Sequence, residues 1–211
     1  MTETMTVHEA LSELKVLGSR IEKEIGSCTF CITNKHSNTK INGKTIKDYT
    51  SDVVSRYQKI TDLIKRRTAI KKAVVKSNAI TEITIGNETM TVAEAIEYRN
   101  VGISFIEDLM NSISNDYNIA MTNLRNANGD VLEGKANAYI NGIYGSKDSA
   151  DNTAIEKTRK SYIEENTLDF IDPIGVEKAI QELYDRIDMF NSKVDSALSV
   201  SNARTEITIN Y

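Results

Sequence analysis

Two cysteines and one histidine are the residues of this sequence best suited to chemistry. Cys28 and Cys31 enclose a Thr-Phe pair, and His36 follows shortly afterwards. Thiolate and imidazole groups at such short spacing suit tetrahedral zinc, but a structural zinc site needs four ligands and no second cysteine pair follows. Cys28, Cys31 and His36 are therefore weak metal candidates, and a reduced cysteine pair beside a loop is the favoured interpretation. No cofactor is expected.

Sequence motifs of catalysis are absent. The chain has no glycine-rich phosphate loop, no Gly-x-Ser-x-Gly elbow and no His-Glu-x-x-His pair. Two histidines leave little scope for the commonest general base. Neighbouring carboxylates such as Glu164 and Glu165 are typical of surface acids, although paired carboxylates perform acid-base chemistry in some enzymes. We expect a protein that is not an enzyme.

A basic run could contact phosphates: Lys65-Arg66-Arg67, then Lys71-Lys72 and Lys76. On a helix these positions spread around much of the circumference, so a solvated face paired with acidic neighbours is the favoured interpretation. The whole chain has 26 basic and 30 acidic residues and a net charge of -4. Because such a chain repels an anionic polymer on average, no nucleic-acid partner is expected.

The strongest signal in the sequence is an internal repeat. Residues 3–11 return as residues 88–96 with identity or near identity at eight of nine positions, and residues 77–85 return as residues 201–209 with one difference. The order of segments is the same in both parts of the chain. The repeat predicts two units, 1–86 and 87–211, that arose by internal duplication and pack as one compact domain.

Each unit begins with a helix-start signal and contains two long apolar stripes. Thr6 to Glu9 and Thr91 to Glu94 have the Thr-x-x-Glu form of a capping box. Apolar residues then recur at three- and four-residue steps, and the last stripe has the spacing of a coiled-coil seam. The expected fold is mainly α, with two long αα-hairpins packed as a helical bundle. The last stripe consists of Val176, Ile180, Leu183, Ile187, Phe190, Val194 and Ala197.

Short strands are predicted at the repeat boundaries, where apolar residues alternate with threonines. Residues 81–85 and 88–90 flank Gly86-Asn87 and read as a tight hairpin. The repeat then implies that residues 205–209 pair with residues 3–5, because both segments otherwise lack a partner. The two ends of the chain should therefore meet, either within one chain or between neighbouring chains. Pairing between chains would build a ring or a filament.

The two units differ mainly in their middles, where the second has an insertion at about 126–172. Four glycines in this stretch predict a loop or small hairpin region that includes Tyr139 and Tyr144, followed by a short helical piece from about 154 to 165. Two interpretations remain open for this loop-rich insertion. It is either tolerated surface decoration or a contact arm.

The order of these segments resembles a known family. A Met-Thr-Val-x-Glu-Ala helix start, a long hairpin, a Ser-Asn-Ala-x-Thr-Glu-Ile element, a glycine turn and a second helix start are similar to the septicolysin-like proteins, a small helical family. An Asn-x-x-Thr-Glu-apolar strand near the end, here Asn202, Thr205, Glu206 and Ile207, adds to the likeness. The likeness covers most of the chain outside the insertion. It implies either a pore-forming cytolysin or a phage or prophage structural protein, and no catalytic residues come with it.

These patterns together predict a self-assembling structural protein. No run of apolar residues is long enough to span a membrane and no secretory signal is expected, so the chain should be soluble, without a membrane partner, and cytoplasmic during assembly. A phage virion accessory, capsid-associated or part of a head-tail connection, is the favoured role, and a septicolysin-like membrane-active protein is the alternative. The partners would be other protein subunits, most simply copies of the same chain. The candidate partner contacts are Tyr139, Tyr144, Ile207, Ile209 and Met5.

Overall fold

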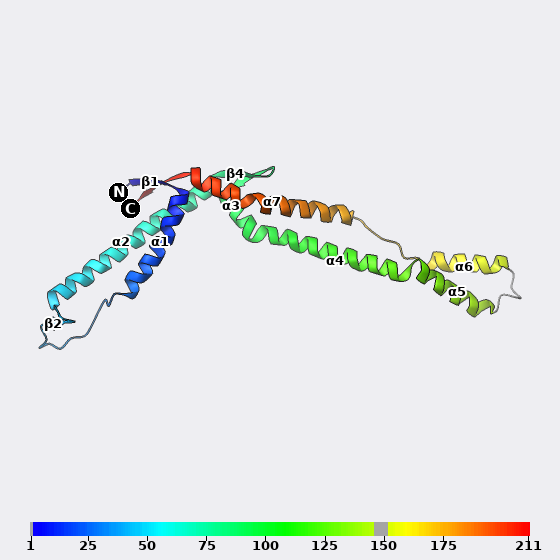
Figure 1. Ribbon diagram of the computed structural model, residues 1–211, viewed down its shortest axis with the longest axis horizontal. Helices are drawn as coiled ribbons and strands as arrows, with labels where there is room; N and C mark the ends of the chain where they lie inside the picture. The colour runs from blue at the N-terminus through cyan, green and yellow to red at the C-terminus, as the bar shows by residue number, and fades with distance from the viewer. Residues whose placement is uncertain (1, 146–151) are drawn as a thin grey trace. The chain divides into compact units, whose positions relative to one another are not determined.

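The computed structural model describes residues 2–145 and 152–211, and it is mainly α-helical with short antiparallel ribbons (Figure 1). The chain divides into two compact units. Unit 1 consists of Met1–Val101 and Met189–Tyr211, and unit 2 consists of Gly102–Asp188. The compact units differ in extent from the sequence units 1–86 and 87–211, because the last strand and the end of the last helix belong with the N-terminal half.

Both predicted helix starts are confirmed. Helix α1 (Val7–Gly26) begins after Thr6, whose amide donates to the Glu9 carboxylate at 2.8 Å while the Glu9 amide donates to the Thr6 hydroxyl at 3.2 Å. Helix α3 (Val92–Glu97) begins with the same pair of bonds, at 2.7 and 3.2 Å, between Thr91 and Glu94. Each box satisfies two amides that the first turn leaves unpaired.

Both predicted strand pairings are confirmed as well. Strand β1 (Thr2–Thr6) pairs with β6 (Glu206–Asn210), and β4 (Glu82–Ile85) pairs with β5 (Glu88–Thr91), all antiparallel. The β1–β6 ribbon, which we call the terminal ribbon, joins the two ends of one chain. The registers match residue for residue: Thr4 faces Thr208 as Thr89 faces Thr84, and Met5 faces Ile207 as Met90 faces Ile83.

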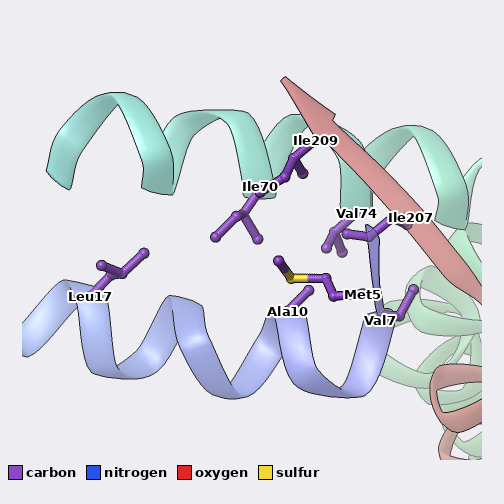
Figure 2. Close-up of a cluster of buried hydrophobic side chains, with 8 residues drawn as sticks. All are labelled: Met5, Val7, Ala10, Leu17, Ile70, Val74, Ile207 and Ile209. Atoms are coloured by element: carbon purple, nitrogen blue, oxygen red, sulfur yellow. The ribbon is translucent and has the colours of Figure 1, made fainter. Parts of the chain in front are cut away.

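The terminal ribbon closes a core between α1 and α2 (Ile46–Asn78). Figure 2 shows side chains of both helices pointing toward each other, with those of the ribbon at one end of the cluster. A fully buried Ile or Val contributes about 1.5 to 3 kcal/mol, so this cluster is a main source of stability for unit 1. Its buried members are Met5, Val7, Ala10, Leu17, Ile70, Val74, Ile207 and Ile209.

The apolar residues Val53, Tyr57, Ile60, Ile64 and Val74 recur near helical spacing and predict one buried stripe on α2, and this prediction is only partly right. Ile60 and Val74 are buried as expected, but Tyr57 and Ile64 are 60% and 43% exposed. Ile70, which the stripe omitted, is fully buried. The helix turns a face containing Leu63, Ile70 and Val74 toward the core, at steps of seven and four residues, because those positions meet α1 and β6.

The hairpin of β4 and β5 depends on Gly86. This residue adopts a φ of 63°, which favours glycine, and a Cβ at this position would overlap the sulfur of Met189. Met189 lies in helix α7 (Val176–Arg204), whose last part belongs to unit 1. The turn of the second ribbon is therefore packed against α7.

The predicted loop-rich insertion at 126–172 is wrong for most of its length. In unit 2, helix α4 (Ile103–Ala127) is followed by α5 (Asp130–Tyr144) and α6 (Asn152–Asn166), so only the predicted helical piece at 154–165 is confirmed as such. Gly134 and Gly142 lie inside α5. A helical glycine costs about 1 kcal/mol relative to alanine. The buried stripe Leu132, Ala136 and Ile140 outweighs that cost by packing α5 against α6.

Candidate functional site

Arg66 forms the most connected polar site of unit 1, at the terminal ribbon. Its guanidinium donates to Glu13 of α1, with one bond of 2.8 Å, and to Glu3 of β1 at 2.7 and 3.3 Å. It also donates to the hydroxyl of Tyr211, just after β6, and lies 4.9 Å from the centre of that ring. These four residues, the Arg66 cluster, tie α2 to both ends of the chain.

The charges of the Arg66 cluster stabilise one another. The Arg66 side chain is only 19% exposed. Its hydrogen bond to Glu3 lowers the pKa of that carboxyl below its ordinary value, and bonds to Glu13 and then Glu3 raise the pKa of Arg66. The guanidinium of Arg66 and the carboxylate of Glu3 therefore each favour the ionised form of the other. These charge-assisted hydrogen bonds therefore hold the terminal ribbon against α2.

An aromatic pair occupies the corresponding place beside the second ribbon. Counted from the matching segments, Tyr98 corresponds to Glu13 and Phe190 corresponds to Arg66. The rings of Tyr98 and Phe190 meet edge to face, with centroids 4.7 Å apart. The β4–β5 ribbon, already closed by a short turn, thus has an apolar contact where the terminal ribbon has an ion pair.

The three metal candidates lie in the connection between α1 and α2. Both cysteines are free, with Cys28 half-buried and Cys31 exposed, and His36 is exposed in a turn. In residues 2–145 and 152–211, no group of three or more His, Cys, Asp or Glu side chains could hold a metal ion. The connection is instead fastened to α2, since Tyr49 donates to the Thr29 carbonyl at 3.1 Å.

The candidate partner contacts fall into two groups. Met5, Ile207 and Ile209 are buried in the chain's own core, so a partner reaches them only if the terminal ribbon opens. Tyr139 and Tyr144 fasten α5 to α6: Tyr139 stacks on Tyr162 at 4.6 Å, and the Tyr144 hydroxyl lies 2.9 Å from that of Thr158. Tyr139 remains 45% exposed. Contact of any of these residues with a partner stays a prediction.

The basic run is divided between two roles. Arg66 belongs to the cluster described above, whereas Lys65, Arg67, Lys71, Lys72 and Lys76 are exposed. Sequence reasoning did not single out Arg66, because its partners lie 53 to 145 residues away.

No family model, curated protein or solved structure matches the chain. Among the helices of the described residues, none is both long enough and apolar enough to cross a bilayer.

Proposed function

We propose that the chain is a non-enzymatic structural protein that assembles with copies of itself, with the terminal ribbon as the joint. The observation that carries the proposal is the equivalence of the strands. Strands β1 and β5 share Glu-Thr-Met-Thr, strands β6 and β4 share Glu-Ile-Thr-Ile, and the two ribbons have one register. The β6 strand of one copy can therefore form with β1 of another copy the same antiparallel pairing that it forms within its own chain.

Exchange of the terminal ribbon between chains conserves its contacts. Ile207 and Ile209 would be buried again beside Met5 and α2 of the neighbouring chain, and the Arg66 cluster would form again with Tyr211 supplied by the exchanged strand. Two residues link β4 to β5, whereas the whole chain separates β1 from β6, so only the terminal ribbon can exchange without breaking a short turn. Such swapping is a low-cost route to oligomers, and mass action favours it at high concentration.

A locked variant tests this joint. In a Cys28→Ser, Cys31→Ser background, Thr4→Cys and Thr208→Cys are oxidised at high dilution to close the ribbon within each chain. Sedimentation velocity from micromolar to millimolar concentration should show larger oligomers for the reduced variant than for the oxidised one, in which the terminal ribbon cannot exchange. Oligomers of equal size in both states would contradict the joint, and monomers in both states would contradict self-assembly.

The narrower role that we propose is a phage virion accessory, either capsid-associated or part of a head-tail connection. It is supported by the resemblance described above and by the self-pairing ends, which suit a repetitive assembly. Mass spectrometry of purified particles from a host that carries the gene tests it. The chain should be present at a constant ratio to the capsid protein, and particles without it would contradict the role.

A further inference from the structure

The outer side of α2 has a strongly basic face. Lys65, Arg67, Lys71, Lys72 and Lys76 are all exposed on it, and no acidic residue occurs from Ile64 to Thr81. Val75, which is 55% exposed, lies among them. We call these five cations together with Val75 the basic face. It surrounds an exposed apolar residue with charged side chains, as the polar rim of an interface surrounds its apolar core.

Among residues 2–145 and 152–211, little neutralises the basic face. Lys65 lies 3.7 Å from Asp62, in an exposed pair that is worth little. For Arg67, Lys71, Lys72 and Lys76, the described part of the chain provides no carboxylate within ion-pairing distance. Their mutual repulsion is therefore not offset locally, and an acidic partner would relieve it.

Helix α7 shows that the fold does not require these cations. Counted from the shared Ser-Asn-Ala segment, α7 buries Val194 and Leu198 where α2 buries Ile70 and Val74. The exposed positions differ completely in charge. Arg67, Lys71, Lys72 and Lys76 correspond to Asn191, Asp195, Ser196 and Val200. A helix in the same role thus does without the positive charge, so the basic face is not explained by packing or by solubility of the helix.

We propose that the basic face binds the acidic surface of unit 2 of a second copy of this chain. Residues 102–188 contain 16 acidic and 8 basic residues, whereas unit 1 contains 18 basic and 14 acidic residues. On α7, the exposed Asp185 and Asp188 accompany Tyr184, which is 55% exposed. This surface offers carboxylates around an apolar ring, the complement of cations around Val75.

The second copy is a better partner than a nucleic acid. The backbone of a nucleic acid would meet the cations with phosphates alone, whereas unit 2 presents carboxylates beside the exposed ring of Tyr184, which can cover Val75. A second copy brings the matching carboxylates in fixed stoichiometry. This inference rests on the proposed self-assembly and adds to it a lateral contact that is sensitive to salt, separate from the terminal ribbon.

The first test measures association with and without the basic face. Arg67→Asn with Lys72→Ser introduces the residues that α7 has at these positions, and Lys15→Ser with Arg20→Asn removes two exposed cations of α1 as a matched control. In sedimentation velocity at low salt, the first variant should associate about tenfold more weakly than the parent, and the control should associate within about twofold of it. Raising the salt concentration should weaken the self-association of the parent protein and leave that of the first variant nearly unchanged. Equal association of both variants would overturn the inference.

A charge exchange identifies the partner surface. Lys71→Glu should weaken association about tenfold, and adding Asp188→Lys should restore it, because the pair regains opposite charges. If neither Asp188→Lys nor Asp185→Lys restores the association that Lys71→Glu weakens, the assignment of the partner surface to unit 2 is overturned. Tight binding of a labelled duplex DNA that Arg67→Asn with Lys72→Ser abolishes would overturn it in favour of a nucleic acid. If the parent is monomeric at every concentration, the proposed function fails; if it assembles without regard to these variants, only this inference fails.

Discussion

The hydroxyl oxygens of Thr4 and Thr208 lie 3.2 Å apart across the terminal ribbon, although 204 positions separate them in the chain. The hydroxyls of Thr84 and Thr89, five positions apart, lie at the same 3.2 Å across the other ribbon. One pair is held by a two-residue link, and the other is held by the fold of the whole chain. The second ribbon is therefore a built-in control for every experiment on the first.

Arg66→Ala should lower the free energy of unfolding by about 1 to 2 kcal/mol, because it removes hydrogen bonds to two carboxylates and leaves Glu13 half-buried without its cation. Lys65→Ala, which breaks only an exposed pair, should change it by less than about 0.5 kcal/mol. Urea unfolding followed by circular dichroism measures both. Equal effects of the two substitutions would contradict the role of the Arg66 cluster.

The double variant Arg66→Phe with Glu13→Tyr places beside the terminal ribbon the aromatic pair that Tyr98 and Phe190 form beside the β4–β5 ribbon. We expect it to be more stable than Arg66→Ala, since an edge-to-face ring pair contributes about 0.5 to 1.5 kcal/mol beyond its burial. The same urea titrations measure it. A double variant that is less stable than Arg66→Ala would show that the two sites are not structurally equivalent.

Gly134→Ala and Gly142→Ala should each raise the free energy of unfolding by about 0.5 to 1 kcal/mol, because both residues lie inside α5 and a Cβ at either position meets no other atom within 4 Å. Gly129→Ala is the control. Its added Cβ also meets open space, but its φ of 57° is strained for alanine, so stability should fall. Thermal melting monitored at the helical signal separates the three variants, and a loss of stability in Gly134→Ala would contradict a helix at this position.

The capping boxes should make stability fall in acid. Hydrogen bonds from Thr6 and Thr91 lower the pKa values of Glu9 and Glu94 from the ordinary 4.5. A carboxyl whose pKa is lowered by folding contributes stability that is fully present above 4.5 and is lost as the pH falls through the lowered value. The variant Glu9→Gln with Glu94→Gln should therefore lose less stability than the parent between pH 5 and about pH 2. Parallel pH profiles from urea unfolding would refute this.

The sequence predicts the ribbons and helix starts well because both signals are local or repeated. Each Thr-x-x-Glu box is contained in one helical turn, so no distant residue is needed to recognise it. The pairing of residues 3–5 with residues 205–209 is a long-range contact, and it was predictable only because the matching hairpin at 83–90 supplies its template. The prediction of a mainly α fold with these pairings is confirmed, whereas the duplication itself stays a prediction.

The remaining features depend on tertiary contacts or on a signal that was overlooked. Gly134 and Gly142 suggested a loop, but packing of α5 on α6 overrides the weak helix propensity of glycine. The Arg66 cluster brings together three distant segments, and no spacing rule links them. Strands β2 (Lys40–Ile41) and β3 (Lys44–Thr45) form a small hairpin that was not predicted. Its Asn42-Gly43 turn, in which both residues have positive φ, is the sequence signal that indicates it.

The pairing of the chain's two ends is tested most directly by a disulfide between positions 4 and 208. In a Cys28→Ser, Cys31→Ser background, Thr4→Cys with Thr208→Cys should oxidise completely under mild conditions, as Thr84→Cys with Thr89→Cys should, and peptide mapping by mass spectrometry should find both cross-links. When the variant is oxidised at high dilution, the disulfide between positions 4 and 208 should form within one chain. Free thiols at positions 4 and 208, under conditions in which positions 84 and 89 are fully linked, would contradict the account.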